Sequence, residues 1–481
     1  MFDPRPIAFI IGVLLGILAV AMLIPAAVDL VAGHGEWQIF LASAALTAFI
    51  GGALVISCRT GWGGFSLRQA FIMTNLAWLV IVVFGALPFV FSELKMSLTD
   101  SFFEAMSGIT TTGSTVIVGL DQAPPGILLW RAILQWLGGI GIIVMAIAIL
   151  PVLQVGGMQL FRVEAFEADK VLPRAAQIAA GISIIYVFLT ALATIVLWAL
   201  GMSKLDAVAH AMTSIATGGF STRDGSVGHF NSPAIDWCMS LFMVLGSLPF
   251  VLYLRAVRGN IGDLFRDSQV RVFFGVLAAA ILLTAIWLWR QGFMEPIPAL
   301  RYSTFNVISI MTGTGYATTD FGQWGGFALT VLFLLMFVGG CAGSTTCGIK
   351  IFRFQVLYAT AKVQLKRLSQ PNGVFVAQFN RRPIPDAAAA SVMGFFFLFI
   401  TSFALLAGAL GFIGLDFRTS VSGAASAIAN VGPGLSDIIG PAGTFAELPD
   451  EAKWLLSAGM LLGRLELFTV LVLFTRSFWR G

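Results

Sequence analysis

Apolar residues are gathered in ten runs along the chain, and each run is long enough to cross a lipid bilayer as a helix, which takes about 20 residues. The runs lie near residues 6–31, 37–57, 69–92, 126–153, 175–200, 234–257, 271–291, 324–353, 386–412 and 453–478. Polar and glycine-rich connections separate them. The pattern predicts an all-α integral membrane protein with ten transmembrane helices.

Four shorter segments of a different kind lie between these spans. Each is mildly apolar, is rich in small and hydroxyl residues, and leads into a glycine. They lie near residues 99–112, 205–218, 301–314 and 419–431. None is long enough to span a bilayer, so they predict short helices that enter the membrane and turn back.

Aligned on the glycine, the four short segments form an internal repeat. Each has a hydroxyl residue six positions before the glycine and an aspartate shortly after it. The glycines are Gly113, Gly219, Gly315 and Gly432, the hydroxyl residues are Ser107, Thr213, Ser309 and Ser426, and the aspartates are Asp121, Asp224, Asp320 and Asp437. The order of elements is the same each time, so the repeats are parallel and related by an axis along the membrane normal.

The repeat predicts four fused helix–pore loop–helix units with pseudo-fourfold symmetry around a central pore. Two extra transmembrane helices in residues 1–66 precede them. The predicted repeats occupy residues 67–160, 161–262, 263–370 and 371–481.

Composition and charge support a membrane environment and suggest an orientation. The chain is 58% hydrophobic and only 11% charged, whereas a soluble domain carries about 25% charged residues. With ten spans both termini share a side, and most lysines and arginines fall on that side. The positive-inside rule therefore predicts cytoplasmic termini, and it puts the four short segments on the outer side.

Four short helices that dip in from outside direct their C-terminal ends, which carry partial negative charge, toward a shared axis. The extended segments that return from each short helix to the outer side expose backbone carbonyls. Rings of carbonyls can replace the hydration shell of an ion. Glycine permits backbone angles that a side chain forbids. The third copy, TGTGY at 312–316, is similar to the filter strand of potassium channels. The arrangement predicts a pore for a monovalent cation.

The four filter sequences, TTTGST, ATGGFST, TGTGYAT and NVGPGLS, resemble those of the Trk/Ktr/HKT superfamily of potassium transporters. The similarity covers essentially the whole chain and is greatest to the bacterial Trk membrane subunit of the TrkH/TrkG type. It implies a subunit that conducts K⁺ and Rb⁺ inward. It also implies a K⁺ selectivity filter, with K⁺ held at the four glycines and with these residues: Thr111, Thr112, Gly113, Thr217, Gly218, Gly219, Gly313, Thr314, Gly315, Asn430, Val431 and Gly432.

Two details of the filter bear on selectivity. In related plant proteins a serine at the first glycine position accompanies sodium selectivity, so Gly113 favours potassium. Gly218 in the second filter and Pro433 in the fourth make the ring asymmetric.

The eighth span is interrupted by VGGCAGSTTCG at 338–348, which prevents a regular lipid-facing helix. The resemblance implies that this segment is an intramembrane gate loop below the filter. The alternatives are a kinked packing helix and a phosphate-binding loop, although Ile349 breaks the Gly-Lys pair and no strand precedes it. The expected gate residues are Gly339, Gly340, Gly343, Ser344, Thr345, Thr346, Gly348 and Arg464.

Arg464 lies near the middle of the last span, where a charge is costly and usually faces a cavity or a partner. The resemblance implies a positive barrier to cations beneath the filter. The alternative is a structural pair with Glu466 or with backbone carbonyls, although Glu466 lies on a different helix face. The aspartates after the filters either concentrate cations at the mouth or are simply solvated.

Partners are suggested by the basic segment 350–382, which suits acidic lipid headgroups. The resemblance implies a homodimer and a cytoplasmic regulatory subunit of the TrkA type that binds NAD(H) or ATP/ADP. This chain shows no nucleotide-binding fold of its own, so nucleotide control would come through that subunit. We expect no covalent cofactor and no nucleic-acid partner, and we expect the protein in a bacterial inner membrane.

Other classes of membrane protein fit less well. A transporter for an organic solute would have inverted repeats, and a water pore would have two opposed half-helices. An enzyme would need convergent titratable groups, and the spans contain almost none apart from Arg464 and Glu466. A Na⁺- or proton-coupled cation symporter of the same fold stays open as the alternative.

Overall fold

The computed structural model describes residues 3–59, 66–148 and 171–480. The first part of the bundle is an antiparallel hairpin of α1 (Arg5–Ala32) and α2 (Trp37–Ser57), followed by the first repeat. The first repeat comprises α3 (Leu67–Gly85), α4 (Leu87–Phe91), α5 (Leu98–Ile109), η1 (Leu120–Gln122) and α6 (Pro125–Ala148). The predicted boundary between the first two repeats, at residue 160, lies outside the described residues.

The remaining repeats share the order of a long helix, a short pore helix and a second long segment. The second contains α9 (Val171–Ala199), α10 (Lys204–Ile215), η2 (Ser226–Phe230), α11 (Pro233–Ser247), α12 (Phe250–Val257) and α13 (Gly262–Arg266). The third contains α14 (Ser268–Arg290), α15 (Pro296–Met311), η3 (Phe321–Gln323), α16 (Gly325–Met336) and α17 (Ile351–Ser369). The fourth contains β1 (Gln378–Phe379), β2 (Arg382–Pro383), α18 (Asp386–Ile413), α19 (Phe417–Ala429), α20 (Asp450–Arg464), α21 (Leu467–Leu471), η4 (Val472–Phe474) and α22 (Arg476–Arg480).

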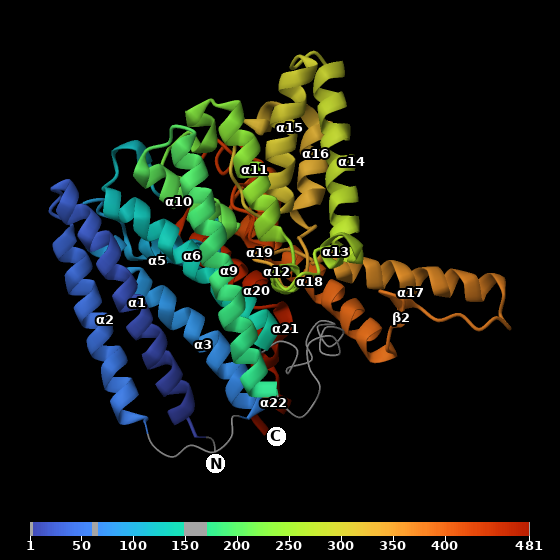
Figure 1. The fold of residues 1–481 in the computed structure, drawn as a ribbon, viewed down its shortest axis with the longest axis horizontal. Helices are drawn as coiled ribbons and strands as arrows, with labels where there is room; N and C mark the ends of the chain where they lie inside the picture. Colours follow the sequence, from blue (N-terminus) through green and yellow to red (C-terminus); the bar gives the residue numbers. More distant parts are fainter. Residues whose placement is uncertain (1–2, 60–65, 149–170, 481) are drawn as a thin grey trace.

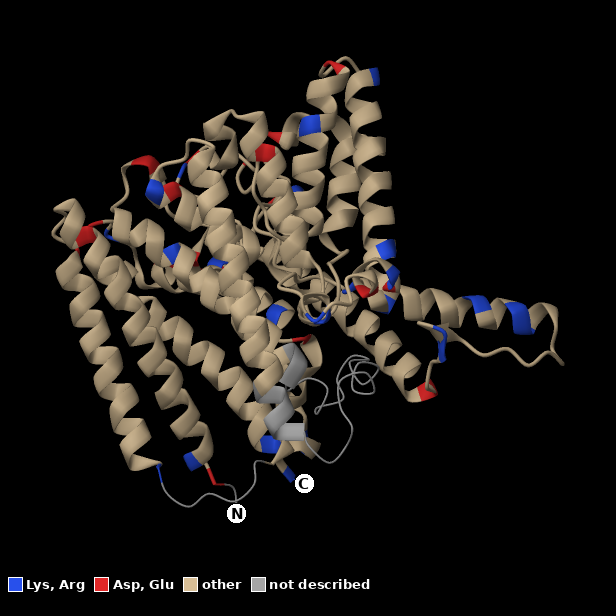
Figure 2. Ribbon diagram, viewed as in Figure 1, with Lys and Arg blue, Asp and Glu red and all other residues tan. Residues whose placement is uncertain are grey.

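The predicted transmembrane character is confirmed. In the described part of the chain, seven helices are long and apolar enough to cross a membrane, two further spans are bent helix pairs, and α16 is a shorter apolar helix. The long helices α1 and α14 have their charged residues near their ends (Figure 2). Both termini lie at the same end of the molecule (Figure 1).

Two spans that the sequence predicted as continuous are broken in the structure, and the eighth span is interrupted as predicted. α11 and α12 meet at 94°, and α20 and α21 meet at 112°. Pro249 stands at the first break and cannot donate a helical hydrogen bond, while Glu466 at the second has a φ of 63°. α16 ends at Met336, and α17 projects sideways from the bundle (Figure 1). Much of the predicted basic loop 350–382 is therefore the helix α17.

The short helices α5, α10, α15 and α19 are the predicted pore helices. Three of them begin at a capping side chain that accepts a hydrogen bond from the backbone N–H three residues later: Ser97, Ser203 and Asp416. Such caps satisfy backbone donors that a helix start leaves free. We call the side at which these helices begin the outer side.

The N-terminal hairpin depends on a close contact between glycines. A Cβ atom on Gly12 of α1 would lie 2.7 Å from the carbonyl oxygen of Gly51 on α2, and one on Gly51 would lie 2.9 Å from the carbonyl oxygen of Gly12. Small residues allow helix backbones to approach closely within a membrane.

We expect Gly12→Leu to push α1 and α2 apart and to lower the free energy of unfolding by about 1–3 kcal/mol, the usual cost of overpacking. Thermal unfolding in detergent measures the effect. Gly16→Leu is the matched control, because a Cβ at Gly16 meets nothing within 4 Å. Equal melting temperatures for the two variants would contradict the proposed importance of this contact.

Candidate ion pathway: a fourfold filter above a gate loop

The four pore helices end in turns with the same backbone geometry. The second residue before each aligned glycine has a positive φ: 53° at Thr111, 50° at Thr217, 68° at Gly313 and 51° at Asn430. The backbone N–H of the next residue donates at 2.8–3.0 Å to the carbonyl of the hydroxyl residue that the four repeats share: Thr112 to Ser107, Gly218 to Thr213, Thr314 to Ser309, and Val431 to Ser426. The alignment made from sequence therefore corresponds to equivalent positions in space.

The aligned glycines bring the four turns together as a ring. Gly113, Gly219, Gly315 and Gly432 have φ values of 90°, 78°, 85° and 108°. A Cβ on any of them would lie closer than 3.0 Å to a carbonyl oxygen of another repeat: Gly218 for Gly113, Thr314 for Gly219, Val431 for Gly315, and Thr112 for Gly432. Each partner precedes the glycine of the next repeat, so the contacts run from the first repeat to the fourth and back.

Side-chain hydrogen bonds connect the first and fourth turns of this ring. Ser114 Oγ donates to the carbonyl of Gly432 at 2.7 Å. Asn430 Nδ2 donates to Thr112 Oγ1 and to the carbonyl of Met460, both at 2.9 Å. All twelve predicted filter residues therefore lie in or beside one ring.

A buried ion pair supports the filter from behind, and the sequence analysis did not identify it. Arg131 Nε lies 2.7 Å from Glu104 Oε1, and both side chains are almost fully buried. Glu104 also accepts from the backbone N–H of Val116, and Arg131 donates to the carbonyl of Ser221, so the pair contacts the strands after two filters. The signal in the sequence was a charge within an apolar run, which is usually functional or paired.

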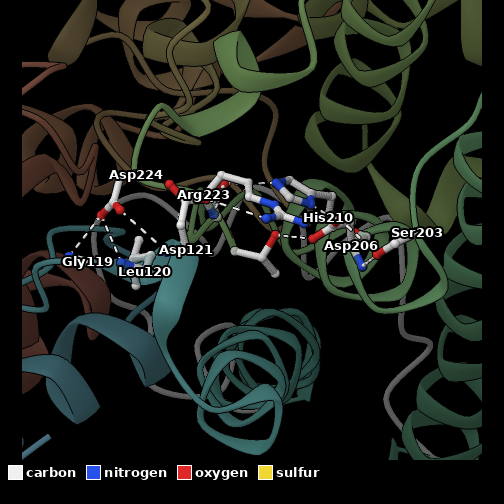
Figure 3. Close-up of polar contacts among 10 residues, drawn as sticks. Gly119, Leu120, Asp121, Ser203, Asp206, His210, Arg223 and Asp224 are labelled. Carbon is white, nitrogen blue, oxygen red and sulfur yellow. Dashed lines mark hydrogen bonds and ion pairs between the residues drawn. The ribbon is translucent and has the colours of Figure 1, made fainter.

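The outer mouth is held by charged residues from two repeats (Figure 3). Asp224 accepts from the backbone N–H groups of Gly119, Leu120 and Asp121. Arg223 bridges Asp206 at 2.8 Å and Asp121 at 3.5 Å. Burial raises the pKa of Asp206, but hydrogen bonds from Arg223, Thr222 and Ser203 outweigh it and hold that pKa below its usual range.

Local contacts therefore occupy most of the aspartates that follow the filters. Besides Asp224 and Asp121, Asp320 accepts from the backbone N–H of Gly322. Asp437 differs, because its side chain is 87% exposed and lies 3.6 Å from Arg418. His210 is fully buried, and its ring nitrogens lie beside the carbonyl of Asp206 and Ser221 Oγ.

The interrupting segment 338–348 folds as a loop directly under the filter. It begins and ends at an isolated bridge between Val338 and Ile349. Thr345 Oγ1 lies 3.1 Å from Thr217 Oγ1 of the second filter, and Cys347 Sγ lies 3.9 Å from Thr111 Oγ1 of the first. The helix α16 precedes the loop, so the surroundings are not those of a phosphate-binding loop. Of the other predicted gate residues in this loop, Gly339, Gly340, Ser344 and Thr346 are buried, and Gly343 and Gly348 are half-buried.

Arg464 fastens this loop to the bundle. Its guanidinium donates to the carbonyl of Thr345 at 3.1 Å, to Cys347 Sγ, and to the carbonyl of Gly138 on α6 at 2.9 Å. Glu466 pairs instead with Arg353 of α17 at 2.5 Å. The Arg464–Glu466 pair, one of the structural alternatives, is therefore wrong. The other alternative, in which Arg464 donates hydrogen bonds to backbone carbonyls, is observed.

A cavity of about 30 Å³ lies next to the loop, room for about one water molecule. The cavity is lined by the loop, by Lys350 just before α17, by Ile142 of α6 and by residues of the last span, among them Arg464 and Glu466. No group of three or more His, Cys, Asp or Glu side chains in the described ranges is arranged to hold a metal ion.

We expect Glu104→Gln to leave the buried charge of Arg131 without a counter-charge and to lower the free energy of unfolding by about 3–5 kcal/mol. Thermal unfolding of the purified protein measures this loss. Asp437→Asn removes a carboxylate from an exposed pair and is the control, expected to change stability by less than about 1 kcal/mol. A Glu104→Gln variant as stable as that control would show that the buried pair contributes little.

Four re-entrant helices, a ring of glycines and carbonyls, and a buried loop beneath it define an integral membrane protein of the cation-transport class. Residues 36–480 match the model of the TrkH family, described as cation transport protein. The chain belongs to this family.

Known relatives match over nearly the whole chain. The chain is 48% identical to the Trk system potassium uptake protein TrkI of Halomonas elongata, over 99% of this chain and 97% of that protein. It is 38% identical to the Trk system potassium uptake protein TrkH of Escherichia coli, over 99% of each. The crystal structure of the potassium transporter TrkH from Vibrio parahaemolyticus matches with a TM-score of 0.92 at 35% identity, covering 100% of both chains.

Proposed function

We propose that this chain is the membrane subunit of a potassium uptake system and conducts K⁺ and Rb⁺ inward through the ring of filter glycines. The observation that carries the proposal is the closed order of contacts between each glycine and the carbonyl of the next repeat. Such carbonyls replace the water that an ion loses on entry. Inward movement follows the membrane potential, which is worth about 2.3 kcal/mol per charge for every 100 mV.

The loop 338–348 and Arg464 form the gate in this proposal. Thr345 and Cys347 contact two filter strands from the inner side, and Arg464 holds both residues against α6. Its positive charge opposes a cation leaving the filter. Opening therefore requires the loop to move away from Thr217 and Thr111 and the guanidinium to leave its carbonyl partners.

The finer features of the proposal follow from the same arrangement. Both termini and α17 lie on the cytoplasmic side of a bacterial inner membrane, because that side collects most of the basic residues. A second copy of the chain and a cytoplasmic nucleotide-binding subunit of the TrkA type complete the assembly. NAD(H) or ATP/ADP acts through that subunit. α17 leads directly from the gate loop and projects from the bundle (Figure 1), so it offers a path from a partner to the gate.

The filter assignment is tested by cation flux into proteoliposomes that contain the purified protein, with K⁺, Rb⁺, Na⁺ and Li⁺ compared. We expect K⁺ and Rb⁺ flux well above Na⁺ flux, and a loss of that preference in Gly113→Ser, because the new Cβ collides with the carbonyl of Gly218. Gly119→Ser is the matched control, since Gly119 has a φ of 78° but nothing within 4 Å of a Cβ. It carries the same backbone strain without the collision.

Two outcomes would contradict the proposal. Absence of cation flux in the wild type, even with a regulatory subunit supplied, would mean that the fourfold ring is not a pore. Equal loss of selectivity in the Gly113 and Gly119 variants would mean that strain, and not the contact with the next repeat, sets the preference.

The gate assignment is tested by Arg464→Ala in the same flux assay without a partner. Hydrogen bonds to charged groups are worth about 1.5–3 kcal/mol each, so losing one shifts the gate toward open by about tenfold or more. We therefore expect higher basal K⁺ flux. Arg290→Ala, at the exposed outer end of α14, serves as the control. Unchanged basal flux in a folded Arg464 variant would show that this residue is not the barrier.

A further inference from the structure

The four filter strands are braced in different ways. In the first repeat Thr110 Oγ1 lies 2.8 Å from Thr112 Oγ1, and in the third Thr312 Oγ1 lies 2.7 Å from Thr314 Oγ1. The second and fourth repeats lack both hydroxyls at these positions. The residues there are Ala216 and Gly218 in the second repeat, and Ala429 and Val431 in the fourth.

Gln135 supplies the brace that the second strand lacks. It is fully buried and lies on α6 of the first repeat, one turn beyond Arg131. Its Nε2 donates to the carbonyl of Gly218 at 2.6 Å, and its Oε1 accepts from the backbone N–H of Phe220 at 3.0 Å. The two partners flank the filter glycine Gly219, so one side-chain amide holds the strand on both sides of it.

The glycine at position 218 is explained by this side chain. Gly218 is not among the glycines with positive φ, so its backbone would accept a side chain. A Cβ there would instead lie closer than 3.0 Å to Cδ and Oε1 of Gln135. The amide of Gln135 thus fills the space beside the strand that a threonine side chain fills in the first and third repeats.

This brace acts on one member of the carbonyl ring. The carbonyls of Thr112, Gly218, Thr314 and Val431 are the four that touch the filter glycines. In the described part of the chain, only that of Gly218 has a side-chain hydrogen bond. Of the four carbonyls in the ring, that of Gly218 is therefore held in position by a residue of another repeat. The hydrogen bond from Gln135 also occupies one of its lone pairs.

We propose that Gln135 is a selectivity-determining positioning residue of the filter: its amide holds the second filter strand at the spacing that a K⁺ ion requires. The inference rests on the proposed function and deepens it. A smaller Na⁺ ion needs carbonyls that move inward, and Gln135 anchors the Gly218 carbonyl from behind. Without the amide, the second strand is free to close around Na⁺.

Gln135→Ala and Gln135→Glu test this in the proteoliposome flux assay. We expect the K⁺/Na⁺ flux ratio of Gln135→Ala to fall about fivefold or more, the scale of one lost hydrogen bond, while K⁺ flux persists. Gln135→Glu retains the shape but replaces the donor with an acceptor facing the Gly218 carbonyl, so its ratio falls at least as far. A purely structural role would lower all cation fluxes together and leave the ratio unchanged.

Asn75→Ala is the matched control, because it also removes a buried amide that donates to a backbone carbonyl, that of Thr469 on α21. We expect its K⁺/Na⁺ ratio to equal that of the wild type. A ratio that falls equally in Asn75→Ala and Gln135→Ala would overturn the inference.

A compensating pair of substitutions provides a second test. Gly218→Thr alone collides with Gln135, so we expect it to lose selectivity. In Gln135→Ala/Gly218→Thr the collision is gone and a side chain again fills the space, so the ratio recovers above that of Gly218→Thr. If Gln135→Ala does not fold, Gly218→Ala displaces the amide without removing it, and the same fall in ratio is expected.

The two levels of the proposal fail in different ways. A K⁺-selective wild type with an unchanged ratio in the folded Gln135 and Gly218 variants would overturn the role of Gln135 and leave the pore intact. A wild type with no cation flux, or with no preference for K⁺, would overturn the proposed function and this inference with it.

Discussion

The contact between each aligned glycine of the four repeats and the carbonyl of the next repeat is the constraint on which the rest of the structure depends. The contact leaves no room for a Cβ atom, and each glycine also has a positive φ. Two independent reasons, space and backbone conformation, therefore require glycine at each of these positions. Because four such contacts close on themselves, no strand can shift without displacing its neighbours. The pore helices, the caps and the buried pairs behind them all serve to hold four chain segments in this one ring.

One face of α6 connects the outer mouth, the filter and the gate. Arg131 donates to the carbonyl of Ser221, Gln135 to that of Gly218, and the carbonyl of Gly138 accepts from Arg464. Positions 131, 135 and 138 follow the spacing at which helix residues share a face. Polar groups within a membrane are costly unless they are satisfied internally. Their concentration on one helix therefore makes α6 a rigid support along the candidate ion path.

The breaks in two spans both provide hydrogen-bond partners for the loop 338–348. Where α11 ends, the carbonyls of Gly246 and Ser247 accept from the backbone N–H groups of Thr345 and Cys341 in the loop 338–348. Where α20 ends, Arg464 reaches the same loop. Irregular backbone at membrane depth needs such partners inside the protein, because lipid offers none. The loop and the interrupted helices therefore satisfy each other at the level just below the filter.

The sequence by itself determined the membrane class, the positions of most spans, the fourfold repeat and the glycines at which its turns meet, because these depend on local apolar runs and on turns that need glycine. The interruption at 338–348 was also visible, since small polar residues cannot form a lipid-facing helix. Only the tertiary structure decided the bends near Pro249 and Glu466, the direction of α17, and the partners of Arg464, Glu104 and Gln135. These depend on contacts between repeats far apart in the chain, where a buried charge or amide shows that a partner is required, but only the fold decides which group provides it.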